Sequence, residues 1–328
     1  MQKLRVLIVS PALADANNGN WQTAQRWKSL LAPHTVRIVR EWPDAQAEQA
    51  AQDDIMLALH ARRSAAAVQA WFDQRGPKGL GLVLTGTDLY RDIQHDAAAQ
   101  AALTQAHSLV VLQSQGLQAL PQVHHSKTRV IVASGRSRQT LVKTARHLRV
   151  VMVGHMRDEK DPRTLMAAAQ LLRTRPDIFI DHIGQALDPA LGQAAHETQT
   201  QCPRYRWLGG LPHAATLQRI QRAHLLVHTS RMEGGAHVLM EALRSGTPVL
   251  ASRIDGNLGM LGDNYPGVFE VGDAPALADL LQQCRSNQNS FGGLLSHLSA
   301  LCAERATLFE PQAERSALHR WVQDLWTH

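Results

Sequence analysis

Residues 225–257, which read LLVHTSRMEGGAHVLMEALRSGTPVLASRIDGN, constrain the fold more than any other stretch of the chain. The apolar run 225–228 predicts a buried parallel strand, because it is short and uninterrupted. From His237 apolar residues recur at helical spacing, and a Ser-Gly pair followed by Pro248 predicts where this helix stops. A second apolar run then predicts another strand. In such a βαβ unit, ligands bind at the carboxyl ends of the strands, near the helix N-terminus.

Two carboxylates belong to this unit. Glu233 lies in the predicted loop, and Glu241 lies in the second turn of the predicted helix, on the same face as His237. Gly234 and Gly235 carry no side chain, so their N–H groups can approach a ligand at the positive end of the helix dipole. N–H groups for phosphate together with carboxylates for hydroxyls suit a nucleotide-sugar. The open alternative is that both glutamates are solvated surface residues.

The same string resembles the E-x7-E segment of retaining glycosyltransferases of family 4, which have the GT-B fold and the pattern S-x-x-E-G-x-x-x-x-x-x-E-A-x-x-x-G-x-P-V. The matching residues are Ser230, Glu233, Gly234, Glu241, Ala242, Gly246, Pro248 and Val249. This resemblance implies a catalytic Glu233 that faces the hydroxyls of the donor sugar, and a Glu241 that holds the ribose. It also implies contacts with the sugar and diphosphate from Gly234, Gly235, Ala236, His237 and Val238.

A second match follows the predicted strand 148–153. The family pattern there is V-G-R-x-x-x-x-K, in which arginine and lysine clamp the donor diphosphate and neutralise the leaving group. Gly154 and Lys160 match, whereas His155 stands at the arginine position. Arg157 or Arg163 could compensate, or a histidine that is charged part of the time could be tolerated. The resemblance thus implies catalytic roles for Lys160 and His155, and donor contacts from Gly154 and Arg157.

The N-terminal half alternates apolar strands with helical stretches, which predicts a first doubly wound domain. Its strands are expected at 4–9, 36–39, 55–59, 80–84, 108–112 and 128–132. Three loops at the carboxyl ends of these strands combine polar, basic and small residues that suit a phosphate-bearing acceptor. Plain turns and solvated arginines are equally open alternatives. The acceptor candidates are Asn18, Gly19, Asn20, Arg62, Arg63, Thr85, Gly86, Thr87 and Asp88.

A chain of 328 residues is suited to two domains that each bury a core. The polar, basic stretch 137–149 predicts the linker between them. We expect an acceptor domain at 1–145, a donor domain at 146–310, and at 311–328 a C-terminal helix that packs back on the first domain. The resemblance implies an α/β GT-B architecture, two Rossmann-like doubly wound domains that face a central cleft.

Charge and cysteine content indicate which classes of binding partner and which cellular compartment suit this chain. The formal charge is +6 without a block of consecutive Lys or Arg, which favours attraction of small anionic substrates over nucleic acid. Three widely spaced cysteines form no C-x-x-C pair, which favours a reducing compartment without zinc. No apolar run approaches the ~18 residues that span a bilayer, and no D-x-D pair ends a strand. We expect a cytoplasmic protein without membrane, metal or cofactor, with a monomer as the working expectation.

Four loop segments carry a narrower resemblance. NNGNWQTAQRW, LHARRS, LTGTDLYRD and VGHMRDEKDP are together similar to the selenosugar synthases of selenoneine biosynthesis. That resemblance implies a UDP-sugar donor, UDP-N-acetylglucosamine, and a selenophosphate acceptor, giving a 1-selenosugar with a carbon–selenium bond. An ionised selenium nucleophile needs little help from a general base. The alternatives are a family 4 enzyme that acts on a hydroxyl acceptor, and a non-catalytic protein that binds nucleotide-sugars.

Overall fold

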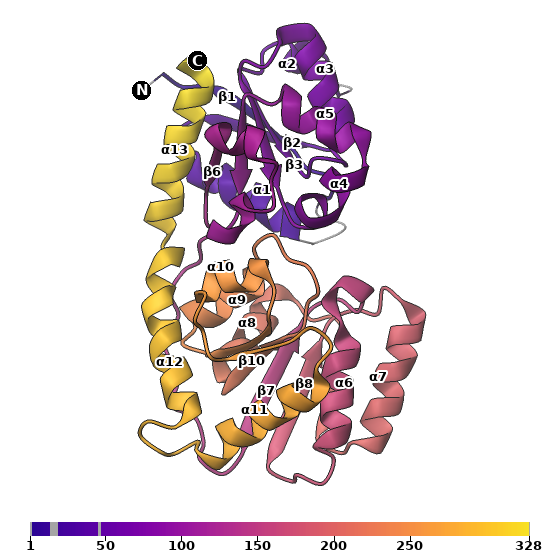
Figure 1. Ribbon diagram of the computed structural model, residues 1–328. Helices are drawn as coiled ribbons and strands as arrows, with labels where there is room; N and C mark the ends of the chain where they lie inside the picture. The colour runs from indigo at the N-terminus through magenta and orange to yellow at the C-terminus, as the bar shows by residue number, and fades with distance from the viewer. Residues whose placement is uncertain (1, 14–18, 45–46, 328) are drawn as a thin grey trace. The chain divides into compact units, whose positions relative to one another are not determined.

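The structure is a computed structural model that describes residues 2–13, 19–44 and 47–327. Backbone packing groups the chain into two units (Figure 1). The first comprises residues 1–134, 233–236 and 308–328, and the second comprises 135–232 and 237–307. The predicted division at residue 145 lies inside the second unit, because the preceding segment packs there: the N–H of Arg138 donates to the carbonyl of Arg244 at 2.8 Å.

The first unit is built on a parallel sheet whose strands are nearly all apolar. The order is β2-β1-β3-β4-β5-β6, and every neighbouring pair is parallel. From β1 the chain adds β2 on one side, and from β3 onward it adds strands on the other side. The carboxyl ends of β1 and β3 are therefore the topological switch point of this sheet. The strands are β1 (Arg5–Val9), β2 (Thr35–Val39), β3 (Ile55–Leu59), β4 (Leu80–Leu84), β5 (Ser108–Val111) and β6 (Thr128–Val130).

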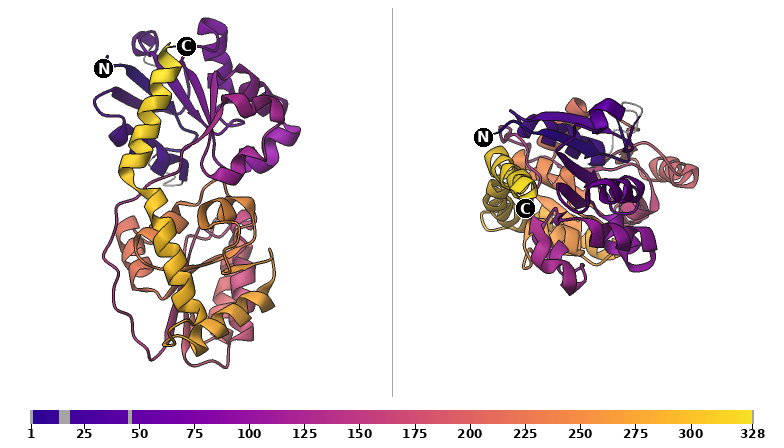
Figure 2. Two further views of the ribbon diagram at one scale, coloured as in Figure 1. Left: turned by 60° about the vertical axis from the view of Figure 1, so that its left-hand side comes forward. Right: turned by 90° about the horizontal axis from the view of Figure 1, so that it is seen from above.

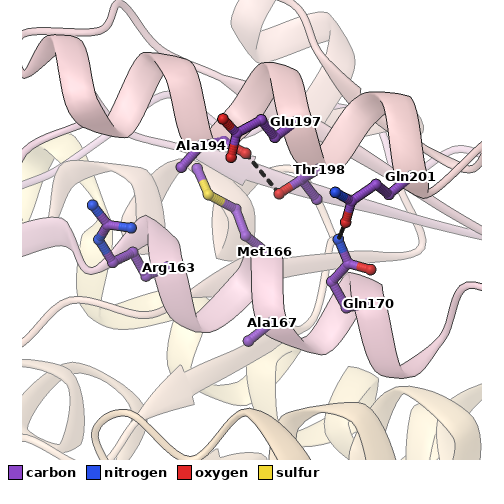
Figure 3. Close-up of a pocket in the computed structure, with 8 residues that line it drawn as sticks. All are labelled: Arg163, Met166, Ala167, Gln170, Ala194, Glu197, Thr198 and Gln201. Atoms are coloured by element: carbon purple, nitrogen blue, oxygen red, sulfur yellow. Dashed lines mark hydrogen bonds between the residues drawn. The ribbon is translucent and has the colours of Figure 1, made fainter.

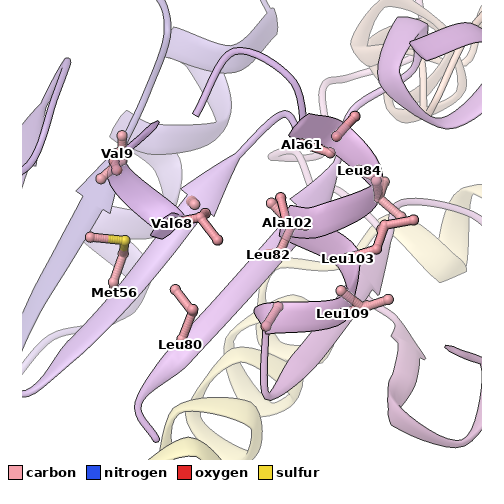
Figure 4. Close-up of a cluster of buried hydrophobic side chains, with 14 of the residues drawn as sticks. Val9, Met56, Ala61, Val68, Leu80, Leu82, Leu84, Ala102, Leu103 and Leu109 are labelled. Atoms are coloured by element: carbon pink, nitrogen blue, oxygen red, sulfur yellow. The ribbon is translucent and has the colours of Figure 1, made fainter. Parts of the chain in front are cut away.

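Helices cover both faces of this sheet. On one face α3 (Ala65–Arg75) and α5 (Ala97–Gln105) close a buried apolar cluster (Figure 4). On the other face α1 (Gly19–Leu30) packs beside α13 (Pro311–Thr327), the yellow helix at the C-terminus in Figure 2. The rings of Trp27 and Trp321 meet edge to face, with centroids 5.9 Å apart. A Cβ atom at Gly81 would lie 2.5 Å from the Trp321 ring, so β4 needs glycine there for α13 to dock. The unit also contains short helical segments, which include α2 (Ala47–Ala50), a π-helical turn (Asp88–Asp92), α4 (Ile93–His95) and the 3-10 helices Ser114–Leu117 and Gln122–Lys127.

The second unit repeats the parallel architecture with the order β12-β11-β10-β7-β8-β9. Here β7 to β9 are added on one side and β10 to β12 on the other. The carboxyl ends of β7 and β10 are therefore the switch point of the second sheet. The strands are β7 (Leu148–Val153), β8 (Ile178–Ile183), β9 (Tyr205–Trp207), β10 (Leu225–His228), β11 (Val249–Ser252) and β12 (Val268–Phe269). The helices are α6 (Pro162–Leu171), α7 (Pro189–Gln201), α8 (His213–Arg222), α9 (His237–Arg244), α10 (Asp255–Leu261), α11 (Ala274–Ser286) and α12 (Leu294–Arg305).

The two parallel six-stranded sheets confirm the predicted α/β class. The predicted loop after β4, which carries the acceptor candidates Thr85 to Asp88, passes into the π-helical turn Asp88–Asp92. The helix α1 begins at Gly19, so the acceptor candidates Gly19 and Asn20 are helical. Within the part of the chain that the structure describes, none of the helices has the length and apolar character needed to cross a membrane.

Candidate functional site

Two loops meet at the switch point of the second sheet. One follows β7 and carries Lys160, and the other follows β10 and leads to Glu233. The Thr229 hydroxyl donates to the carbonyl of Lys160 at 2.8 Å, and the N–H of Arg231 donates to the carbonyl of Glu159 at 2.9 Å. These bonds fix the loop of Lys160 against the end of β10, in the place where doubly wound sheets bind ligands.

Gly154 and Lys160, the two residues that match the clamp pattern, lie together. A Cβ atom at Gly154 would stand 3.6 Å from the Cγ and Cδ atoms of Lys160, so the aliphatic stem of the lysine crosses directly over the glycine. The backbone of Gly154 continues the sheet, because its N–H donates to the carbonyl of Ile183 at 2.9 Å. The lysine stem is therefore held along the carboxyl edge of β7.

His155 is a neutral donor in this structure. Its Nδ1 atom accepts a hydrogen bond from the backbone N–H of Gln185 at 3.2 Å, which leaves the ring proton on Nε2. Burial lowers the pKa of His155, and the positive charges of Arg157 and Lys160 lower it further. The imidazole at the family's arginine position can therefore offer an N–H group to an anion, but it is not a fixed positive charge.

Arg157 and Arg231 contact residues of the Lys160 loop, and Arg163 follows it in α6. The side chain of Arg157 is 45% exposed, with its Nε atom 3.9 Å from Glu159. Arg163 lines a pocket of about 200 Å³ between α6 and α7, so it lies on the α7 side of its helix (Figure 3). Sequence reasoning overlooked Arg231, although it stands inside the matched motif, two residues before Glu233. Its guanidinium lies 3.4 Å from the buried carboxylate of Asp161, which raises the pKa of Arg231.

Glu241 has a partner that no motif predicts. It lies in the second turn of α9, and its Oε1 atom accepts a hydrogen bond from Nε2 of His213 at 2.7 Å. His213 is the first residue of α8, and its side chain is 50% exposed, whereas that of Glu241 is 17% exposed. The hydrogen bond to Glu241 raises the pKa of His213. His237 opens α9 as predicted, and both His237 and Val238 are half-buried.

Gly234 and Gly235 pack with the first unit, as do Glu233 and Ala236. A Cβ atom at Gly234 would overlap the carbonyl group of Thr85, and one at Gly235 would lie 2.8 Å from Cβ of Leu112. Both positions therefore require glycine for backbone packing. Contacts of Glu233, Gly234, Gly235 and Ala236 with a donor remain predictions.

The carboxyl edge of the first sheet is ordered around His60 and Asp88. His60 adopts a left-handed backbone with φ of 75°, and its Nε2 atom lies 3.0 Å from the hydroxyl of Thr87. Asp88 is fully buried: its carboxylate accepts N–H groups from Ala61 at 2.8 Å and from Thr85 and Gly86 at 2.9 Å each. Its oxygens thus cap the backbone of this loop, and a contact of Asp88 with an acceptor stays a prediction.

The remaining acceptor candidates are scattered. Gly19 and Asn20 form the first turn of α1, whereas Asn18 lies outside the described residues. Arg62 is 56% exposed, and its Nε atom lies 2.9 Å from the carboxylate of Asp96. Arg63 is exposed. Roles for these residues stay predictions.

No metal centre is apparent in residues 2–13, 19–44 and 47–327, where no group of three or more His, Cys, Asp or Glu side chains is placed to hold an ion. The expectation that no metal or cofactor is needed stays a prediction. The three cysteines, Cys202, Cys284 and Cys302, are buried and free.

Comparison with known families decides the class of protein. The family described as Glycosyl transferases group 1 matches residues 117–292, more than half of the chain. The chain belongs to the group 1 glycosyl transferases. The matched span contains His155, Lys160, Glu233 and Glu241, the residues of both motifs. The loops proposed for the acceptor lie outside the matched span, and the roles of the motif residues stay predictions.

Solved structures confirm the GT-B fold of this glycosyl transferase. Sucrose-phosphate synthase from Thermosynechococcus elongatus is 18% identical, with a TM-score of 0.77 and coverage of 99% of each chain. HepE from Anabaena, solved with UDP-glucose, is 17% identical, with a TM-score of 0.74 and coverage of 98% of this chain and all of HepE. A TarM variant from S. aureus, solved with UDP and alpha-GlcNAc-glycerol, is 14% identical with a TM-score of 0.65. That match covers 84% of this chain, which spans only 56% of TarM.

Proposed function

We propose that this glycosyl transferase moves a sugar from a UDP-sugar, UDP-N-acetylglucosamine, to selenophosphate, and so makes a 1-selenosugar for selenoneine biosynthesis. One observation carries the donor half: the carboxylate of Glu241 is held by His213 in the same unit that places Lys160 and the His155 N–H at the switch point. A carboxylate for ribose hydroxyls and positive or N–H groups for a diphosphate are what a nucleotide-sugar requires. The complexes of HepE with UDP-glucose and of TarM with UDP support this choice.

The proposed reaction breaks the bond between C1 of the sugar and the phosphate oxygen, and the electron pair leaves with UDP. The Lys160 ammonium and the Nε2–H group of His155 would stabilise the charge that develops on the departing diphosphate. A selenium lone pair of selenophosphate forms the new bond to C1. Water then cleaves the selenium–phosphorus bond, which releases inorganic phosphate and the 1-selenosugar.

The acceptor half rests on the first unit and on the loop resemblance. His60 and Thr87 are bonded to each other at the switch point, beside the exposed Arg63. An arginine pair at 62 and 63 with a fixed hydroxyl suits the phosphate group of selenophosphate. Arg62 already pairs with Asp96 at 2.9 Å, so an acceptor phosphate would compete with that carboxylate.

A hydroxyl acceptor is the second candidate. The TarM structure holds alpha-GlcNAc-glycerol together with UDP, which favours a sugar or another small hydroxyl compound as acceptor. A protein that binds nucleotide-sugars without chemistry is the third candidate. The presence of both Lys160 and Glu241 in the matched family span argues against it.

Release of UDP from UDP-N-acetylglucosamine separates the three candidates. The protein is incubated with the donor alone, with selenophosphate made in situ, and with a panel of hydroxyl compounds that includes glycerol and glucose 6-phosphate. UDP release that depends on selenophosphate supports the proposal. Release only with a hydroxyl compound supports the second candidate. Binding of the donor without release in any arm supports the third and overturns the assignment as an enzyme.

A further inference from the structure

One residue of the second unit that contacts a motif residue lies outside both family motifs. Glu241 belongs to the E-x7-E string, but His213, which holds it, lies in a segment that sequence analysis left unassigned. The two residues come from different helices, α8 and α9. Their separation of 2.7 Å is the short distance of a charge-assisted hydrogen bond.

The two oxygens of the Glu241 carboxylate are in different situations. Oε1 of Glu241 accepts the Nε2–H group of His213, whereas among the described residues no side chain or backbone group is seen to donate to Oε2. The carboxylate is mostly buried, and the imidazole is half-exposed. A carboxylate fixed through one oxygen presents the other in a defined direction, which reduces the entropy that a ligand hydroxyl must overcome on binding.

We propose that His213 is a positioning residue for Glu241: it fixes Oε1 so that Oε2 accepts a ribose hydroxyl of the donor, and it makes nucleotide affinity dependent on pH. The inference rests on the proposed function of Glu241 as the ribose ligand. It adds a residue whose imidazole can gain a positive charge near an anionic nucleotide.

The sign of the pH effect follows from the groups that face His213. Glu241 on α9 stabilises the imidazolium, and Arg138, from the segment before β7, opposes it. The hydrogen bond to Glu241 dominates and raises the pKa of His213 above its usual value. The imidazolium form therefore persists to higher pH than in a free histidine. Affinity for UDP should be highest below this pKa and should fall as the pH rises through it.

Calorimetric titration with UDP at pH 6, 7 and 8 tests the proposal in four proteins: wild type, His213→Ala, His213→Gln and the control His297→Gln on the exposed part of α12. His213→Gln keeps an N–H donor but cannot titrate. We expect His213→Ala to weaken UDP binding by about tenfold at pH 7, which is ~1.4 kcal/mol. His213→Gln should stay within about threefold of wild type at pH 8 and lose the dependence on pH. The control should match wild type throughout.

A second readout does not involve a nucleotide. The pKa of His213, followed by NMR of the imidazole nitrogens, should fall in Glu241→Gln, because the carboxylate that stabilises the imidazolium is gone. An unchanged pKa, or UDP binding in His213→Ala that equals or exceeds that of wild type, overturns the positioning role. Failure of wild type to bind UDP, while the pKa of His213 still falls in Glu241→Gln, overturns the proposed function instead.

Discussion

The Nδ1 atom of His155 accepts the backbone N–H of Gln185 at 3.2 Å, and this single bond determines what the residue can offer a ligand. It places the proton of the neutral ring on Nε2, while burial and the charges of Arg157 and Lys160 lower the pKa of the imidazole. Where the family pattern has a permanently charged guanidinium, this chain has a neutral N–H donor. In the proposed clamp, the positive charge would therefore come mainly from Lys160.

Substitution of His155 tests whether its neutral N–H group contributes to catalysis. His155→Ala removes one donor to the developing charge and should lower kcat by about 10²-fold. His155→Gln keeps an amide N–H and should retain the rate within about tenfold. Because the lowered pKa keeps the wild-type ring neutral, both proteins should show the same rate profile between pH 7 and 9. The measurement is the initial rate of UDP release; equal loss in the two variants would show that the N–H group is not what matters.

Substitution of Lys160 should lower kcat more than substitution of His155. Lys160→Ala removes the ammonium next to the leaving diphosphate, so we expect kcat to fall by about 10²–10³-fold. Thermal stability should change little, because the residue ends a short 3-10 turn (Asp158–Lys160) beyond the carboxyl end of β7. Lys3→Ala, on the exposed N-terminal segment, is the matched control for loss of one positive charge. A Lys160→Ala enzyme with the wild-type rate would remove the clamp from the mechanism.

Glu314 should be essential for the stability of the first unit. This buried carboxylate on α13 accepts hydrogen bonds from Nε1 of Trp27 at 2.7 Å, from Nε of Arg26 at 2.9 Å and from the N–H of Ser134 at 2.8 Å. Glu314→Ala leaves several buried donors without an acceptor and should lower the free energy of unfolding by about 3 kcal/mol. Urea titration measures the loss. The control, Gln323→Ala, changes an exposed residue of the same helix and should stay within about 0.5 kcal/mol.

His182 should make the second unit sensitive to acid. It is fully buried in β8, where burial lowers its pKa to about 4 from 6.5, and its Nδ1 atom lies 2.8 Å from the hydroxyl of Tyr205. The unfolded chain takes up a proton near pH 6.5 and the folded chain only near pH 4. Stability is therefore full above pH 6.5 and declines as the pH falls towards 4, by on the order of 3 kcal/mol.

The double variant His182→Leu with Tyr205→Phe removes this proton uptake without leaving a lone hydroxyl behind. Whatever its absolute stability, its unfolding free energy should vary less between pH 6.5 and 4 than that of wild type. Urea midpoints at four pH values give the comparison. Identical slopes for the two proteins would assign the acid sensitivity to other groups.

The central strands were predictable from the sequence because they are short apolar runs with polar ends. The bounds of β3, β4, β7 and β10 are those that the runs predict. Other elements gave weaker signals. The helix α7 (Pro189–Gln201) is largely polar and small in sequence, and its start is set by the side chain of Asp188, which accepts the N–H of Ala190. A cap of this kind becomes visible only once the backbone is placed.

In the candidate site too, the sequence predicted motif residues but not contacts between separate elements. Gly154 and Lys160 were found because a family motif contains both, and the structure brings them together. His213 was missed because its role arises from a contact between two helices, and no spacing in the sequence reveals such a contact. Asp88 illustrates a related limit: a carboxylate at a strand end can face a ligand or cap the backbone, and the three N–H groups that bond to it are visible only in the structure.

The most direct test of the account is mass spectrometry of the products formed from UDP-N-acetylglucosamine with selenophosphate made in situ. Wild type should give UDP, phosphate and a hexosamine with selenium bonded to C1 in equal amounts. Lys160→Ala should give at least about a hundredfold less of all three in the same time. Turnover of the donor without any selenium-bearing sugar, in the presence of selenophosphate, would contradict the proposed acceptor. No turnover by wild type with any acceptor would contradict the proposed donor site itself.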